Sequence, residues 1–138
     1  MKIYFAGSIR GGRDDKELYE KIIKLLSRYG TVLTEHVGAQ TLSSMGEDGR
    51  SDKYIYNRDM NWLKEADVVV AEVTTPSLGV GYEIAKAENM GKNILCIFRE
   101  NGNNLSAMIG GSSKLTIERY STYDNLQSVI VYYFKQKG

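Results

Sequence analysis

Glu83 lies where an apolar side chain is expected. Val80, Ile84 and Ala87 recur at the spacing of an inward helix face, and Glu83 falls between them, three residues after the first and four before the last. Ionised glutamate is rarely fully buried unless it has a partner, so an inward carboxylate needs an explanation. Glu83 either pairs with an arginine, caps a loop or takes part in chemistry.

Asp59 poses the same question on a second predicted helix. Its spacing of four from both Ile55 and Leu63 places it in an apolar stripe, where a structural hydrogen bond to the preceding loop is the alternative to catalysis. Two neighbouring carboxylates are typical of glycosidic bond cleavage, in which one attacks the anomeric carbon and the other protonates the leaving group. Tyr4 either orients the nucleophile through its hydroxyl or is a core aromatic.

A glycine-rich loop after the first expected strand has the features of a phosphate site. It consists of Gly7, Ser8, Ile9, Arg10, Gly11, Gly12 and Arg13. Glycines expose backbone N–H groups, Arg10 offers a bidentate donor, and the following helix presents its positive dipole end. The alternative is an ordinary turn with two solvated arginines. The loop lacks the dinucleotide and P-loop glycine patterns, which argues against NAD and ATP.

A second loop, residues 73–79, places Ser77 beside Pro76 and before Gly79, at the expected start of a helix. Ser77 is a candidate second donor to an anion. The alternative is an ordinary N-cap serine, with glycines for close packing.

The remaining reactive side chains are few. The one histidine, His36, follows the second expected strand near the cleft mouth, and the one cysteine, Cys96, lies mid-strand and is predicted to be an inert core thiol. No cluster of histidine, cysteine and acidic residues has metal-ligand spacing, so no metal site is predicted.

Composition limits the possible functions. With 138 residues, 42% hydrophobic and 25% charged, the chain is expected to form one globular domain over residues 1–138. A net charge of +1 offers no broad basic field for nucleic acid. No apolar run approaches the roughly 20 residues of a membrane helix, and one cysteine favours a reducing compartment. We therefore expect a cytoplasmic protein that binds neither nucleic acid nor membranes.

Short β-branched runs alternate with amphipathic stretches, which is the pattern of a parallel α/β sheet. The expected strands are 2–6, 31–34, 67–73, 93–99 and 115–120. The expected helices are 14–29, 51–64, one that ends near residue 91, a turn at 105–109, and 126–134. The last run also suits a strand; as a helix apolar on all sides, it is expected to contact a second subunit. Residues 35–50 are expected to form a lid or binding loop.

These elements predict a doubly wound five-stranded parallel sheet of order 2-1-3-4-5, flavodoxin-like, with helices on both faces. Ligands of such sheets bind at the carboxyl ends of the strands, at the point where the strand order reverses. That rule selects the loops 7–13 and 73–79.

Four stretches of the chain resemble a known enzyme family. They are YFAGSIRGGR at 4–13, GTVLTEHV at 30–37, ADVVVAEV at 66–73 and PSLGVGYE at 76–83. These closely resemble the 2′-deoxynucleoside 5′-phosphate N-hydrolases of the nucleoside 2-deoxyribosyltransferase superfamily, and LSAMI at 105–109 is similar too. The resemblance implies hydrolysis of a deoxynucleoside 5′-monophosphate to free base and 2-deoxyribose 5-phosphate, without a metal or organic cofactor.

The resemblance also implies roles for individual residues. Glu83 matches the nucleophile that forms a deoxyribosyl intermediate, Asp59 the residue that handles the proton of the base, and Tyr4 the tyrosine that assists near the nucleophile. The phosphate-binding positions match Ser8, Arg10 and Ser77. Ser106 matches a serine that reaches the phosphate from the other subunit of a homodimer. The full substrate-binding set that we expect is Gly7, Ser8, Ile9, Arg10, Gly11, Gly12, Arg13, Ser77, Gly79, Ser106 and Met108.

Other functions stay open at this point. A deoxyribosyltransferase moves deoxyribose between bases, but it has no phosphate for Ser8 and Arg10 to hold. A ribonucleotide N-glycosidase acting on CMP-like substrates is a variant of the same chemistry. A non-catalytic nucleotide-binding module needs the loop but neither carboxylate.

Overall fold

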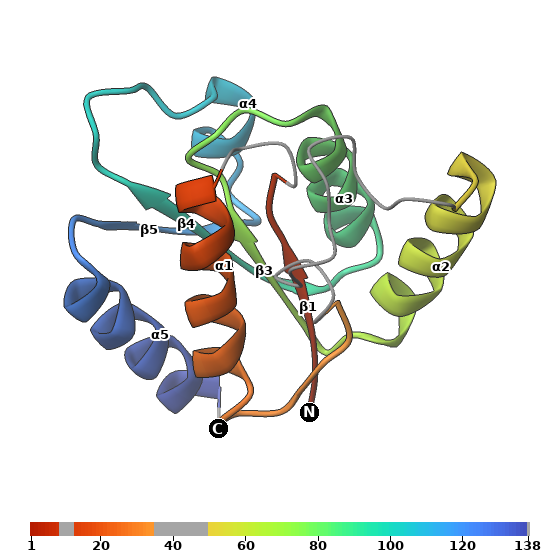
Figure 1. Ribbon diagram of the computed structural model, residues 1–138, viewed down its shortest axis with the longest axis horizontal. Coiled ribbons are helices and arrows are strands. Elements are labelled where there is room, and N and C mark those ends of the chain that lie inside the picture. Colours follow the sequence, from red (N-terminus) through yellow and green to blue (C-terminus); the bar gives the residue numbers. More distant parts are fainter. Residues whose placement is uncertain (9–12, 35–49, 138) are drawn as a thin grey trace.

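The structure, a computed structural model, describes residues 1–8, 13–34 and 50–137 (Figure 1). Its five strands are β1 (Lys2–Ala6), β2 (Thr31–Val32), β3 (Val68–Glu72), β4 (Asn93–Arg99) and β5 (Thr116–Tyr120). Its helices are α1 (Arg13–Leu26), α2 (Asp52–Glu65), α3 (Leu78–Asn89), α4 (Ala107–Gly110) and α5 (Tyr123–Lys137). The predicted loop 35–50 lies outside the described residues except for its last one.

All strand pairs are parallel, and the order is β2-β1-β3-β4-β5, which confirms the predicted sheet. The final run forms a helix, not a strand, because one face of α5 is buried at helical spacing. The buried residues of that face are Leu126, Ile130, Tyr133 and Phe134. Val131 and Tyr132 are exposed, and a contact of α5 with a second subunit stays a prediction.

Strand β2 is shorter than the predicted strand 31–34, although the chain beyond it still bonds to β1. The Leu33 amide donates to the carbonyl oxygen of Ile3 at 2.8 Å. The Thr34 hydroxyl accepts from the Phe5 amide at 2.8 Å and donates to the Phe5 carbonyl at 2.7 Å. A side chain therefore replaces the backbone of Thr34 in the ladder, and the regular strand ends two residues early.

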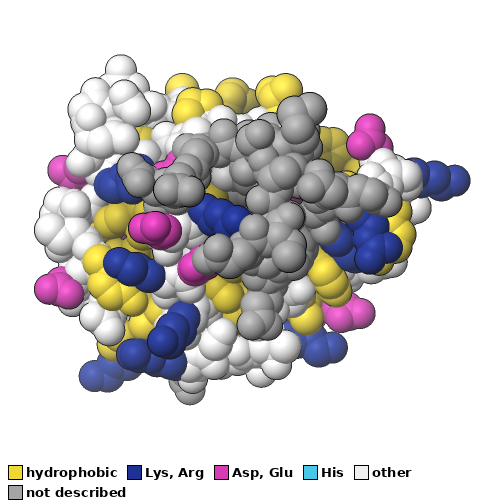
Figure 2. All heavy atoms as spheres, in the orientation of Figure 1, with side chains coloured by type: hydrophobic (Ala, Val, Ile, Leu, Met, Phe, Trp, Pro, Cys, Tyr) yellow, Lys and Arg dark blue, Asp and Glu magenta, His cyan; other side chains and the backbone are white. Residues whose placement is uncertain are grey.

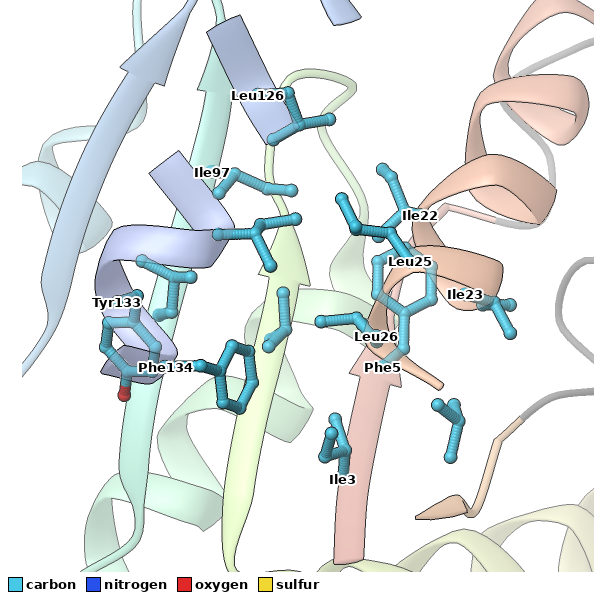
Figure 3. Close-up of a cluster of buried hydrophobic side chains, with 14 of the residues drawn as sticks. Ile3, Phe5, Ile22, Ile23, Leu25, Leu26, Ile97, Leu126, Tyr133 and Phe134 are labelled. Carbon is cyan, nitrogen blue, oxygen red and sulfur yellow. The ribbon is translucent and has the colours of Figure 1, made fainter. Parts of the chain in front are cut away.

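The sheet lies between two apolar layers. Helices α1 and α5 cover one face, where Phe5 and Ile97 pack against Ile22, Leu26 and Leu126 (Figure 3). Helices α2 and α3 cover the other face, which holds a second cluster of buried residues. All five residues of β3 are buried, as expected for a central parallel strand covered on both sides.

The neighbouring strands β1 and β3 bring the two selected loops to one edge. Ala6 pairs with Ala71 at the carboxyl ends of these strands, so Gly7 and Ser8 leave the sheet beside the start of the 73–79 loop. The switch point therefore lies where the sequence places it.

Two surface properties bear on partners. No helix in the described ranges is long and apolar enough to span a membrane. Among the described residues on the face that Figure 2 shows, basic and acidic side chains lie among one another.

Candidate active site

Tyr4 and Glu83 form the central contact of the site. Tyr4 is fully buried on β1, on the sheet face that α2 and α3 cover. Its hydroxyl donates a hydrogen bond to Oε2 of Glu83, which is half-buried on α3. In the described part of the chain the partner of Glu83 is thus a tyrosine, not the arginine that was the structural alternative.

The start of α3 determines where Glu83 lies. Ser77 is the N-cap, and its Oγ accepts from the Val80 amide at 3.3 Å. From that start, Val80 and Ile84 are buried against the sheet, and Glu83 lies at the edge of the same face. The helical spacing therefore predicts the inward position of this carboxylate correctly.

The surroundings raise the pKa values of both members of the pair. Burial raises the pKa of Glu83 to about 7; the hydrogen bond from Tyr4 opposes this shift, and the negative charge of Asp59 adds to it. Burial, followed by the charges of Glu83 and Asp59, raises the pKa of Tyr4 well above its ordinary value. Tyr4 therefore stays protonated and acts as a donor, while Glu83 titrates near neutral pH.

Asp59 lies on α2, close enough for its charge to act on both Tyr4 and Glu83. Its Oδ1 accepts from Nε and Nη2 of Arg58, both at 3.0 Å. The Arg58 guanidinium in turn lies over the Trp62 ring, 4.7 Å from its centroid. Sequence reasoning missed Arg58, because a single arginine on a polar helix carries no distinctive spacing.

The described part of the first loop is tightly held. The Ser8 amide donates to the Tyr19 hydroxyl at 3.1 Å, and Ser8 is only 7% exposed. A Cβ on Gly7 would lie 2.9 Å from the Tyr19 ring, so glycine is required for this close approach. Ile9, Arg10, Gly11 and Gly12 lie outside the described residues, as do Glu35 and His36. Arg13 begins α1, and its side chain is not described.

Ser77 has the capping role that was its structural alternative. A capping hydroxyl accepts one bond and still has a proton to donate to a ligand, so the two roles are compatible. A Cβ added to Gly79 would have only Ser77 Oγ nearby, at 3.9 Å. The backbone at Gly79 is thus open to a ligand.

Ser77 and Ser106 line one groove of about 580 Å³ along α3. Ser106 is the N-cap of α4 and accepts from the Met108 amide at 3.3 Å. The groove walls include Leu78, which is 97% exposed, and Met108, which is 85% exposed. Tyr4, Asp59 and Glu83 do not line it. The structure therefore brings Ser106 and Met108 into one groove with Ser77, but not with Asp59 or Glu83 of the same chain.

Cys96 is buried as predicted, and burial raises the pKa of its thiol. Within residues 1–8, 13–34 and 50–137, no group of three or more His, Cys, Asp or Glu could hold a metal ion.

The fold and this site define a class: a doubly wound α/β protein with a tyrosine-bound carboxylate, and a second carboxylate, beside the switch point. Residues 3–127 match the family model described as nucleoside 2-deoxyribosyltransferase. The chain belongs to that family.

Several known proteins resemble this chain. The 5-hydroxymethyl-dUMP N-hydrolase of Danio rerio is 51% identical over 138 residues, covering 98% of this chain and 96% of that protein. The Homo sapiens protein of the same name is 57% identical over 113 residues, covering 80% of this chain and 65% of that protein. The CMP N-glycosidase structure from Clostridium botulinum has a TM-score of 0.70 at 21% identity, covering 96% of this chain and 99% of that chain. This last likeness shows the fold alone.

We predict that Glu83→Gln stabilises the protein more at pH 8 than at pH 5. The pKa of Glu83 is raised from 4.5 in an unfolded chain to about 7, so its stability contribution is complete below 4.5 and is lost as the pH rises through 7. Glutamine keeps the acceptor for Tyr4 but carries no charge. The measurement is the free energy of unfolding in urea across this pH range, with Glu100→Gln at an exposed position as the control. If the free energy of unfolding of Glu83→Gln differs from that of the wild type by the same amount at both pH values, the raised pKa of Glu83 is contradicted.

Proposed function

We propose that this chain hydrolyses the N-glycosidic bond of deoxynucleoside 5′-monophosphates to free base and 2-deoxyribose 5-phosphate. The observation that carries the proposal is the Tyr4–Glu83 bond, which holds a carboxylate with a pKa of about 7 at the switch point. The names of the relatives, N-hydrolases of a deoxynucleoside monophosphate, support the same reaction and substrate class.

The reaction is a double displacement. Glu83 attacks the anomeric carbon of the deoxyribose, the bond from that carbon to the base nitrogen breaks, and Asp59 supplies a proton to the departing base. Water then attacks the same carbon, gives up a proton to Asp59 and releases Glu83. Tyr4 holds Oε2, so Oε1 is the oxygen directed at the sugar.

The reaction requires the state of the two carboxylates in which Glu83 is ionised and Asp59 carries the proton. Their mutual repulsion favours a state in which one carries a proton and the other a charge. With a pKa of about 7, Glu83 titrates near neutral pH, so its ionised form is available there. Deoxyribose lacks the 2-hydroxyl, and its oxocarbenium-like transition state depends on a nearby anion.

The substrate phosphate binds between the two loops. Ser8 and Arg10 with the rest of loop 7–13 approach it from β1, and Ser77 with Gly79 approaches from the N-terminus of α3. The place of Ser8 just beyond the carboxyl end of β1 and the open backbone at Gly79 support this arrangement.

The functional unit is a homodimer in which Ser106 and Met108 reach the substrate of the partner subunit. The exposed Leu78 and Met108 form an apolar wall that a second copy covers. Ser106 lies in that groove, which Asp59 and Glu83 of its own chain do not line. We further propose that the chain is one cytoplasmic domain.

The first experiment measures base release from a panel of deoxy- and ribonucleoside monophosphates and from the matching nucleosides. We predict that the wild type releases base from deoxynucleotides. Glu83→Gln lowers the rate at least about 100-fold, because it removes a transition-state contact of roughly 3 kcal/mol. Its affinity for nucleotides is kept, since glutamine retains the shape of the side chain.

Three outcomes of this experiment contradict the proposal. A Glu83→Gln protein that works near the wild-type rate excludes Glu83 as the nucleophile. A new nucleoside formed after addition of a second free base identifies a transferase. Base release from CMP but not from deoxynucleotides identifies a ribonucleotide N-glycosidase.

The second experiment tests the homodimer by complementation. Glu83→Gln and Ser106→Ala subunits are co-expressed with different tags, so that about half of the dimers are mixed. We predict activity of about one quarter of the wild type, because the Ser106→Ala subunit has its own Glu83 and receives Ser106 from its partner. If Ser106 serves its own chain, mixing adds nothing to the activity of the separate variants.

A further inference from the structure

Two side chains of α1 that the proposed mechanism does not use connect the two phosphate loops. Asp15 and Tyr19 are one turn apart on the same face of the helix, and they are only 7% and 2% exposed. Each carries a polar group that must find a partner when buried. They find those partners in two different loops.

Tyr19 holds the first loop. Its hydroxyl oxygen accepts from the Ser8 amide at 3.1 Å, and its ring contacts the place where a Cβ of Gly7 would be. The ring also packs edge-on against Phe5, with centroids 5.5 Å apart. The position of Ser8 is therefore set by a helix side chain as well as by the end of β1.

Asp15 holds the second loop. Its Oδ2 accepts from the Thr75 hydroxyl at 2.9 Å, and its Oδ1 accepts from Nη2 of Arg99 at 3.2 Å. Thr75 lies two residues before Ser77, the N-cap of α3. Through Asp15, the first turn of α1 is fixed to the loop that carries Ser77.

Thr74, the residue before Thr75, is also held by hydrogen bonds. Glu72, 1% exposed, accepts from both the amide and the hydroxyl of Thr74 at 2.8 Å, and also from the Tyr120 hydroxyl. The Thr74 hydroxyl accepts from the Arg99 amide at 2.8 Å. This network gives the 73–79 loop a rigid base on β3, β4 and β5.

We infer that Tyr19 and the Asp15–Thr75 pair are positioning residues, which set the distance between the two phosphate loops through α1. Neither the Tyr19–Ser8 contact nor the Asp15–Thr75 contact joins two strands of the sheet. Each joins α1 to a loop that carries a proposed phosphate donor. The inference rests on the proposed function, because it assigns these contacts to phosphate recognition.

The test uses two variants that remove one hydroxyl each and keep the side-chain volume. Tyr19→Phe removes the acceptor for the Ser8 amide, and Thr75→Val removes the donor to Asp15. The controls are Thr75→Ser, which restores the hydroxyl, and Tyr133→Phe, which removes a tyrosine hydroxyl from the same core cluster on α5, away from the loops.

We expect both test variants to raise KM for a deoxynucleoside monophosphate about tenfold, which corresponds to a loss of about 1.4 kcal/mol of binding free energy. We expect kcat to change less than about twofold. The dissociation constant of 2-deoxyribose 5-phosphate, measured by calorimetry, rises by the same factor. Both controls keep wild-type values.

Unchanged KM in both test variants overturns the inference, as does an equal loss in Thr75→Ser. A fall in kcat with KM and the calorimetric affinity unchanged also overturns it, because it indicates a role at the carboxylates. Failure of the proposed function is recognised separately: the wild type then releases no base from any nucleotide.

Discussion

The hydrogen bond from Tyr4 to Glu83 is the contact on which the whole site depends. It joins strand β1 to α3, where Tyr4 is fully buried and Glu83 is half-buried. A buried hydroxyl or carboxylate without a partner is costly, so each group satisfies the other. Burial and the charge of Glu83 keep Tyr4 protonated, which lets it hold one oxygen of Glu83 in a fixed direction.

The same burial that makes Glu83 useful also makes it unfavourable for the fold. Burial and the charge of Asp59 oppose ionisation, whereas attack on a sugar requires the ionised form. Perturbed carboxylates of this kind are typical of functional sites. The rest of the structure supplies the rigidity that keeps this pair in place: a sheet covered on both faces, and a β3 that is buried throughout.

Much of this arrangement could be predicted from sequence, because it depends on periodic patterns. β-Branched runs alternating with amphipathic helices predict the parallel doubly wound sheet, and helical spacing places Glu83 on an inward face. The Tyr19–Ser8 and Asp15–Thr75 contacts could not be predicted, because they join residues whose neighbourhood is set only by the tertiary fold. The early end of β2 could not be predicted for a related reason: the Thr34 hydroxyl, not its backbone, bonds to the backbone of Phe5.

The most direct measurement is the titration of Glu83 itself. In free protein with ¹³C-labelled glutamate, the resonance assigned by comparison with Glu83→Gln should titrate with a pKa of about 7. Replacing Tyr4 with phenylalanine removes a hydrogen bond that lowers this pKa, so the midpoint should move further upward. A Glu83 midpoint near 4.5, unchanged by Tyr4→Phe, would contradict the account.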